Sequence, residues 1–178
     1  MSDQISLRPG KVQDATTISA LGTRVFTHSF SSLMPQDDLA TYLSTSYSVP
    51  SIIKDLENPS MSFIVATKND ELVGFIQLTR GTSEPCIDHL DHKIQLQRLY
   101  VSEKCQDLGI GRILMTQAES EAVDLGFRHM WLASWERNPR AEKMYERAGY
   151  AVRGEMQFRL GSSLLKDWVM VKTLGEMG

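Results

Sequence analysis

Seven residues in the middle of the chain have the types and spacing of an anion-binding turn. They are Gln106, Asp107, Leu108, Gly109, Ile110, Gly111 and Arg112. A glycine lets the backbone approach a ligand closely, because no Cβ intervenes. An amphipathic helix is predicted to begin at Gly109, and the first turn of a helix offers free N–H groups and a partial positive charge. The turn therefore predicts a pyrophosphate site, where Arg112 adds a cationic side chain.

Two other phosphate motifs are excluded by the residues that follow the glycines. A P-loop needs Lys and then Ser or Thr after its last glycine, whereas Gly111 is followed by Arg112 and Ile113. A dinucleotide fingerprint needs a third glycine at position 114, which is Leu114. A glycine pair alone is a weak signal, so the neighbouring elements must support the interpretation.

The strand before this turn changes its hydrophobic phase. Apolar residues occupy even positions at Ile94 and Leu96 and odd positions at Leu99 and Val101. Strict alternation along a strand does not change phase. A β-bulge near residues 97–98 would absorb the extra residue and leave backbone groups unpaired. The alternative is a regular strand in which Tyr100 is simply apolar on the other face.

The elements that must position these residues are read from periodicity and turn signals. Strands are predicted at residues 5–7, 63–66, 72–78, 94–101, 130–135, 150–158 and 164–171. Helices are predicted at 14–26, 34–47, 109–125 and 138–149, with a further short helical turn at 50–56. The β-α-α-β-β-β-α-β-α-β-β order predicts a mixed α/β fold. Its central twisted sheet has about seven strands flanked by about four helices in one domain, residues 1–178.

Composition excludes several classes of protein. The 178 residues are 42% hydrophobic and 23% charged, so the chain is expected to fold into a core. A net charge of −3 gives no electrostatic footprint for nucleic acid. No apolar run reaches the roughly 20 residues that cross a bilayer, and Met1–Gln4 shows no leader. We expect a cytoplasmic monomer or homodimer with reduced thiols and no metal.

Two motifs resemble those of a known family. The stretch from Val101 to Leu114 reads V-x4-Q-x-x-G-I-G-x-x-L and resembles motif A of the GNAT superfamily of N-acetyltransferases. The stretch from Asn138 to Tyr150 reads N-x6-Y-E-R-A-G-Y and resembles the second signature of that superfamily. The two motifs follow in the expected order and at the expected distance. The similarity extends loosely from the first strand to the last.

The resemblance implies a cofactor, acetyl-CoA, and a place for it. Backbone groups of Leu99, Tyr100 and Val101 would bind the pantetheine arm and the thioester carbonyl. Residues 106–112 would hold the pyrophosphate. The strand at 130–135 would diverge from its neighbour and open a V for the cofactor.

Two side chains of the second motif would also reach the cofactor. Asn138 matches an asparagine that contacts it in many family members, and Tyr145 matches a tyrosine near the thioester sulfur. Tyr145 would act as the catalytic acid, because a phenol can protonate a leaving thiolate. The alternative role for Tyr145 is core packing, since it shares a helical face with Ala141, Met144 and Ala148.

The proton of the attacking amine has no obvious acceptor. Many GNAT enzymes place a glutamate on the bulged strand, but residues 94–101 contain no carboxylate. We expect a chain of water molecules to remove the proton, with no single essential carboxylate. Four other side chains are weaker alternatives: His28, His89, Asp91 and His92.

The acceptor is expected to be a primary amine that attacks directly in a ternary complex. Segments 96–101 and 131–138 resemble the bacterial spermidine/spermine acetyltransferase branch. A polyamine needs acidic residues, and the segments on the substrate side carry Asp37, Asp38, Glu84, Asp88 and Asp91. The alternative roles of these residues are helix capping and exposure in solvated loops. Alternatives are a protein N-terminal or lysine acetyltransferase, another small-molecule acetyltransferase, and a non-catalytic acetyl-CoA-binding module.

Overall fold

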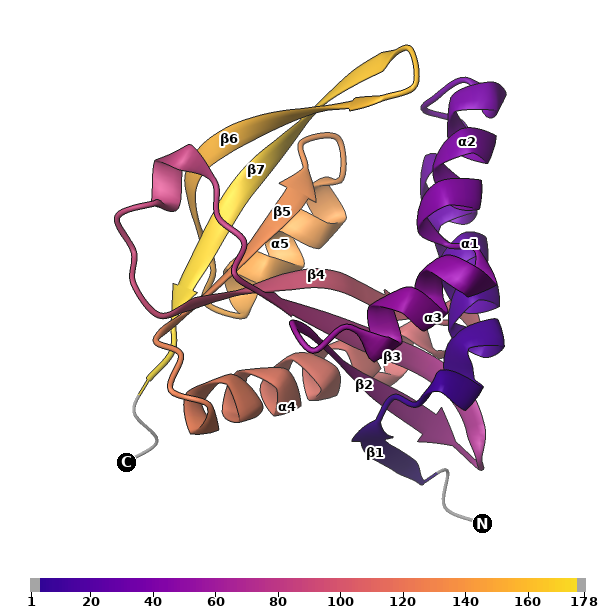
Figure 1. Ribbon diagram of the computed structural model, residues 1–178, viewed down its shortest axis with the longest axis horizontal. Coiled ribbons are helices and arrows are strands. Elements are labelled where there is room, and N and C mark those ends of the chain that lie inside the picture. Colours follow the sequence, from indigo (N-terminus) through magenta and orange to yellow (C-terminus); the bar gives the residue numbers. More distant parts are fainter. Residues whose placement is uncertain (1–3, 176–178) are drawn as a thin grey trace.

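The computed structural model describes residues 4–175 and contains one mixed seven-stranded sheet (Figure 1). The strand order across the sheet is β1-β2-β3-β4-β5-β7-β6. Only β4 and β5 pair in parallel; every other neighbouring pair is antiparallel. The predicted mixed fold and its strand order along the chain are confirmed. The strands are β1 Ile5–Pro9, β2 Met61–Lys68, β3 Glu71–Arg80, β4 Lys93–Val101, β5 His129–Trp135, β6 Ala151–Leu160 and β7 Ser163–Thr173.

Helices cover both faces of the sheet. One face packs on α4 (Ile110–Asp124), whose buried side chains share a core with β2, β3, β4 and β5. The other face packs on α1 (Ala15–Phe30) and α3 (Val49–Glu57). The helix α2 (Gln36–Ser46) stands beside α1, and α5 (Pro139–Arg147) follows β5 (Figure 1). Three short 3-10 helices are η1 Val12–Asp14, η2 Pro85–Ile87 and η3 Glu103–Leu108.

The third helix is longer than the predicted helical turn at 50–56. It begins after Ser48, whose hydroxyl accepts a hydrogen bond from the backbone N–H of Ser51 at 3.3 Å. This N-cap, with Pro50 in the first turn, starts a nine-residue helix. The described residues therefore contain five α-helices, one more than the predicted four.

The bulge in β4 is confirmed. In the register with β3, Gln77 faces Arg98 and Leu78 faces Leu96, which leaves Gln97 as the extra residue. The bulge explains the change of phase, because Leu96 and Leu99 both pack into the core under α4 despite their odd spacing.

The helix after the glycine pair has a narrower apolar face than predicted. Leu114 and Ala118 are fully buried, and Gly126, with φ +89°, follows the end of the helix as expected. Ile113 and Leu125, which helical spacing also predicts to be buried, are exposed. Leu125 follows the last residue of the helix.

Membrane spans, metal sites and disulfides can be judged for residues 4–175, which the structure describes. Within that range, no helix is long and apolar enough to cross a membrane. The same residues hold no group of three or more His, Cys, Asp or Glu side chains placed to bind a metal ion. Cys86 and Cys105 are both free. The expectation of no leader rests on Met1–Gln4, of which Met1–Asp3 lie outside the described residues.

Candidate functional site

The central feature of the site is the divergence of the two parallel strands. Pairing between β4 and β5 runs from Lys93 with His129 to Gln95 with Trp131 and then stops. Beyond this point β4 remains paired with β3 on one side only. Backbone groups of residues 97–101 that face away from β3 therefore have no neighbouring strand. A ligand with amide and carbonyl groups that lies in this opening can hydrogen-bond to them as a strand would.

The three residues proposed along this edge divide between the two faces of the sheet. The side chains of Leu99 and Val101 pack into the core under α4. Tyr100 lies on the opposite face, where its hydroxyl is 2.6 Å from that of Tyr47. The side chains anchor the strand on both faces, and the backbone edge remains available for a ligand.

The glycine turn lies at the wide end of this opening. Residues 106–108 belong to η3, and Gly109 has φ +71°, a left-handed conformation that allows α4 to begin at Ile110. A Cβ built at Gly111 would meet only Val101 Cγ2, at 3.8 Å. The protein's own packing therefore does not require glycine at position 111. This open space beside the first turn of α4 is compatible with the phosphate site expected there.

Tyr145 is positioned by α5. Its ring lies 5.9 Å from that of Tyr150 and packs against the core under α4, so the expected core contact is real. Among the described residues, no group hydrogen-bonds to its hydroxyl. Burial raises the pKa of Tyr145 to about 12. The phenol is therefore protonated at neutral pH and can donate, so the core role and the acid role are compatible.

Asn138 caps α5, as its place before Pro139 predicts. Its Oδ1 accepts a hydrogen bond from the backbone N–H of Ala141 at 3.2 Å. This bond fixes the carbonyl end of the side chain and leaves its amide group free to donate. Asn138 thus starts the helix that carries Tyr145, at the end of β5.

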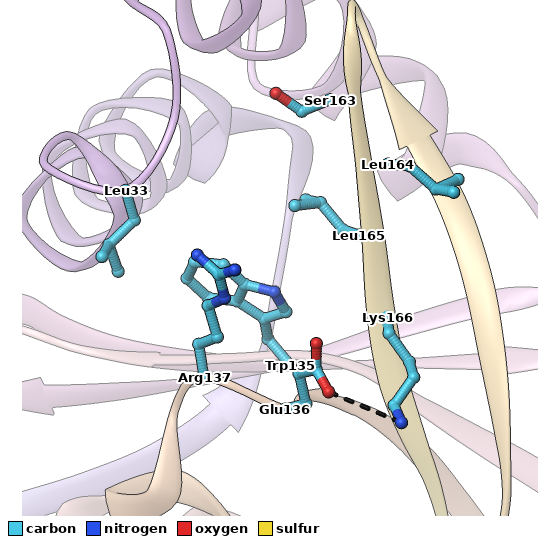
Figure 2. A pocket seen from close by; sticks show the side chains of 8 residues that line it. All are labelled: Leu33, Trp135, Glu136, Arg137, Ser163, Leu164, Leu165 and Lys166. Atoms are coloured by element: carbon cyan, nitrogen blue, oxygen red, sulfur yellow. Dashed lines mark ion pairs between the residues drawn. The ribbon is translucent and has the colours of Figure 1, made fainter.

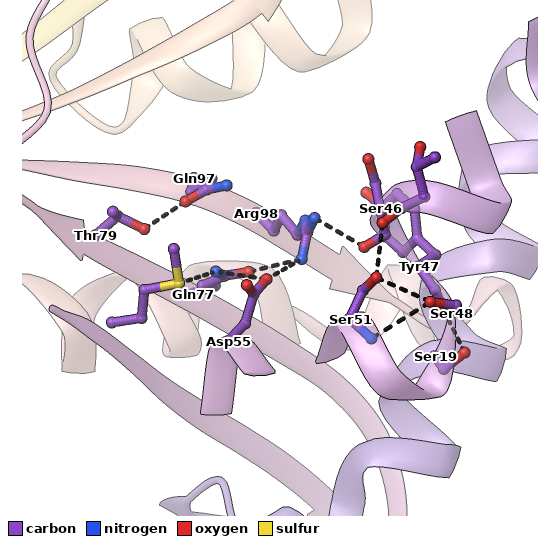
Figure 3. A network of polar contacts seen from close by, with 12 residues as sticks. Ser19, Ser46, Tyr47, Ser48, Ser51, Asp55, Gln77, Thr79, Gln97 and Arg98 are labelled. Carbon is purple, nitrogen blue, oxygen red and sulfur yellow. Dashed lines mark hydrogen bonds and ion pairs between the residues drawn. The ribbon is translucent and has the colours of Figure 1, made fainter. Parts of the chain in front are cut away.

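A buried arginine, which sequence reasoning missed, holds the bulge in place (Figure 3). The Arg98 side chain is 9% exposed and donates to Asp55 Oδ2 at 3.1 Å and to Gln77 Oε1 at 3.0 Å. It also donates to the Ser46 carbonyl at 3.1 Å and lies 4.6 Å from the ring centre of Tyr47. Arg98 thus ties the bulged strand to α2 and α3. A buried guanidinium needs hydrogen-bond acceptors around it. The sequence signal that could have found Arg98 was a charged residue next to the predicted bulge.

An open cavity of about 240 Å³ lies between the α1–α2 connection, the end of β5 and the β6–β7 hairpin (Figure 2). In Figure 2, Leu33 and Leu165 point toward the space over Trp135 from two sides. Trp135 also contacts Phe30, with ring centres 4.8 Å apart. The cavity is therefore lined by both apolar side chains and charged or polar ones. Its lining residues are Leu33, Trp135, Glu136, Arg137, Ser163, Leu164, Leu165 and Lys166.

The acidic residues expected around a polyamine do not gather at this cavity. Asp38 is buried and accepts hydrogen bonds from Ser162 and Ser163, so its charge is used within the fold. Asp37 is exposed on α2. The other three, Glu84, Asp88 and Asp91, lie in the β3–β4 connection. That connection ends where β4 and β5 are still paired.

Three of the four alternative bases are also poorly placed. His92 precedes β4, and Leu99 is seven residues further along the strand, roughly 23 Å at 3.3 Å per residue. His89 and Asp91 lie in the same connection and are exposed. The structure therefore does not bring these three to the open end of the V. His28 is exposed on α1, and its charge helps to lower the pKa of Glu103 at the start of η3, so it lies closer to the end of β4.

These features define a class of protein. A parallel strand pair that opens beside a glycine-rich helix start is the acyl-CoA N-acyltransferase fold that the sequence resemblance implied. The chain belongs to the acetyltransferase (GNAT) family, whose model matches residues 27–150. It is an acetyl-CoA-dependent N-acetyltransferase.

Similar proteins agree with this assignment. An uncharacterized N-acetyltransferase of Mycobacterium tuberculosis is 26% identical over 161 residues, which are 90% of this chain and 98% of the relative. Among solved structures, the PaiA N-acetyltransferase of Thermoplasma acidophilum in complex with coenzyme A has a TM-score of 0.78 at 20% identity. The match covers 96% of this chain and 99% of the PaiA chain. The ribosomal-protein-S18-alanine N-acetyltransferase of Escherichia coli has a TM-score of 0.72 at 14% identity, with 98% and 97% covered. At such low identity, the two structures support the fold alone.

Proposed function

We propose that this enzyme transfers the acetyl group of acetyl-CoA to the primary amine of a small molecule, by direct attack in a ternary complex. The observation that carries the proposal is the opening between β4 and β5 with Tyr145 beside it. The pKa of Tyr100 is raised by burial and, to a lesser extent, by Tyr145, so the two phenols lie near each other. Because Tyr100 belongs to β4 and Tyr145 to α5, this proximity supports a role for Tyr145 as the acid beside the opening.

Acetyl-CoA would lie along the edge of β4, with its thioester in the V. Its pyrophosphate would bind the N–H groups of residues 106–112, and Arg112, exposed at the start of α4, would add its charge. Backbone groups of Leu99, Tyr100 and Val101 would hold the pantetheine arm. The amide of Asn138 would donate to the cofactor from the other side.

The acetyl thioester supplies an electrophilic carbonyl, and the chain supplies the groups around it. An unpaired backbone N–H on β4 can stabilise the negative charge that builds on the carbonyl oxygen, which is worth about 3 kcal/mol for one such donor. Tyr145 would give its proton to the departing sulfur. The wide end of the V leaves room for the amine to approach from the side of the cavity.

The walls of the cavity favour a compact acceptor over an extended peptide. A peptide groove requires the α1–α2 region and the β6–β7 hairpin to stand apart, whereas Asp38 of α2 is hydrogen-bonded to Ser162 in the hairpin. A polyamine remains the specific candidate from the resemblance to the spermidine/spermine branch. Glu136 at the rim offers one carboxylate for a second cationic group, although it is paired with Lys166 at 3.5 Å.

A screen for thiol release from acetyl-CoA tests the proposal. The panel would contain spermidine, spermine, simple alkylamines, amino acid amides and short peptides with free N-termini. We expect turnover with at least one small primary amine and weaker turnover with peptides. Binding of acetyl-CoA without turnover of any amine would favour the non-catalytic module.

A further inference from the structure

One buried carboxylate in the described part of the chain has an oxygen without a partner. Asp167 lies in the middle of β7 and is 9% exposed. Its Oδ1 is buried and makes no hydrogen bond. The other two buried side-chain atoms of this kind, Thr82 Oγ1 and Trp131 Nε1, belong to neutral groups. An unpaired carboxylate in such a position lowers the stability of the fold, which makes Asp167 a candidate functional group.

Asp167 lies on the face of the sheet opposite α4. On β7, Trp168 and Met170 pack under α4, whereas Val169 and Val171 pack on the opposite face. Because side chains alternate along a strand, Asp167 shares the face of Val169. The pKa of Tyr42, raised mainly by burial, is raised further by the charge of Asp167, which places Asp167 near α2.

Two neighbours of Asp167 on this face line the cavity. Trp135 is its partner across the β5–β7 pair, and Leu165 is two residues before it on β7. Trp135 ends β5 and therefore stands at the wide end of the V. Asp167 thus lies one strand away from the opening, on the face from which an amine would enter. Tyr145 packs on the other face.

We propose that Asp167 is the proton acceptor for the acceptor amine, as the end point of a short water chain from the cavity. This inference rests on the proposed function. It keeps the water chain expected from the sequence but replaces the expectation of no single essential carboxylate, because Asp167 would end that chain in place of the carboxylate that β4 lacks.

In the proposed reaction the amine nitrogen loses two protons and the sulfur gains one. An ammonium N–H bond breaks, the proton passes through water to the Asp167 carboxylate, and the nitrogen lone pair becomes free. That lone pair forms the N–C bond to the acetyl carbon, and the C–S bond breaks with its electron pair on sulfur. Sulfur takes the proton of Tyr145, and the second proton that nitrogen loses restores the phenol. Asp167 then returns its proton to solvent.

The surroundings of Asp167 suit this role. Burial raises its pKa to about 7, and the negative charge of Glu136 acts in the same direction. From α2 it is faced by the neutral phenol of Tyr42, and its partner on β6 is Met156. Lys166 is engaged by Glu136 and Glu155. A base with a pKa near the working pH is the most effective, and it becomes protonated and inactive as the pH falls below about 7.

The kinetic test compares Asp167→Asn with the wild type, using the best amine of the panel and a less basic one such as glycinamide. We expect kcat/KM at pH 7 to fall roughly 10²–10⁴-fold, with recovery toward pH 10, where the amine is already neutral. The acid limb of the wild-type profile of kcat/KM against pH should have the same midpoint for both amines. Glu136→Gln should move that midpoint to lower pH. Asp70→Asn, an exposed change in the β2–β3 turn, is the matched control.

A second measurement does not depend on turnover. In protein labelled with ¹³C at the aspartate carboxyls, one NMR signal should titrate near pH 7 and be missing from Asp167→Asn. Wild-type acetyl-CoA affinity in that variant would show an intact fold. Wild-type activity of Asp167→Asn, an unmoved limb in Glu136→Gln, or no carboxyl titrating near pH 7 would each overturn the inference alone. Failure of every amine to react would overturn the proposed function, and the inference with it.

Discussion

The carboxylate of Asp38 accepts hydrogen bonds from both the backbone N–H and the hydroxyl of Ser162, at 3.0 and 2.8 Å. The two residues are 124 positions apart in the chain, on α2 and at the tip of the β6–β7 hairpin. A Cβ at Gly161 would come within 1.9 Å of the same carboxylate, so the hairpin tip needs glycine there. This contact joins two walls of the acceptor cavity.

We therefore expect Asp38→Ala to loosen the acceptor side and leave the cofactor side intact. KM for the amine should rise, while calorimetry should give wild-type affinity for acetyl-CoA. Asp37→Ala, an exposed change one residue away, is the control. Equal effects of the two changes on KM would contradict the proposed role of the contact.

The same contact predicts a pH dependence of stability. Hydrogen bonds from Ser162 hold the pKa of Asp38 below its ordinary value. A lowered pKa stabilises the fold above the unfolded value of about 3.9, and this stabilisation is lost as the pH falls through the folded pKa. The difference in Tm between wild type and Asp38→Ala should thus be largest near neutral pH and shrink below about pH 4. A difference that is constant down to pH 2 would show that the charge of Asp38 contributes nothing.

Gly111→Ala separates cofactor binding from folding. Its Cβ would meet only Val101 Cγ2, at 3.8 Å, so Tm should be near that of the wild type. The same Cβ would occupy the proposed pyrophosphate cradle. We expect acetyl-CoA affinity to fall tenfold or more, about 1.4 kcal/mol, in a calorimetric titration. Thr116→Ala, on the exposed side of α4, should bind normally. Wild-type affinity in a folded Gly111→Ala protein would refute the cradle.

Tyr145→Phe keeps the ring and removes the proposed acid. Because the ring makes the core contacts, Tm and acetyl-CoA affinity should change little. Turnover should fall roughly 10²–10⁴-fold, since a general acid acts in the transition state. Tyr150→Phe is the matched control: it removes a hydrogen bond to Glu119, at 3.2 Å, and should leave kcat unchanged. Wild-type kcat in Tyr145→Phe would leave only the packing role.

Local features of the site were predictable from the sequence, and contacts between distant segments were not. The bulge at Gln97 follows from the change of apolar phase, and the cap at Asn138 follows from the proline after it. Both signals lie within a few residues. The neighbourhood of Asp167 depends instead on the register between β5 and β7, which periodicity does not fix. From the sequence alone, Asp38 is expected to face a cationic substrate, to cap its helix or to lie in solvent, because its partner Ser162 is set by tertiary packing.

Arg98 gives the last prediction, which concerns the support of the bulge. Its guanidinium donates to Asp55, Gln77 and the Ser46 carbonyl, and a lysine ammonium cannot reproduce that planar fork. Arg98→Met would also leave Asp55 without its partner in a largely buried position, which costs about 3 kcal/mol. Urea unfolding should show this loss for Arg98→Met and a smaller one for Arg98→Lys. Arg8→Lys alters a more exposed pair with Asp14 and should cost about 1 kcal/mol or less.

Because the bulge orients the backbone groups offered to the thioester, Arg98→Lys should also raise KM for acetyl-CoA. A stable Arg98→Met protein with unchanged KM would mean that the bulge does not need this arginine.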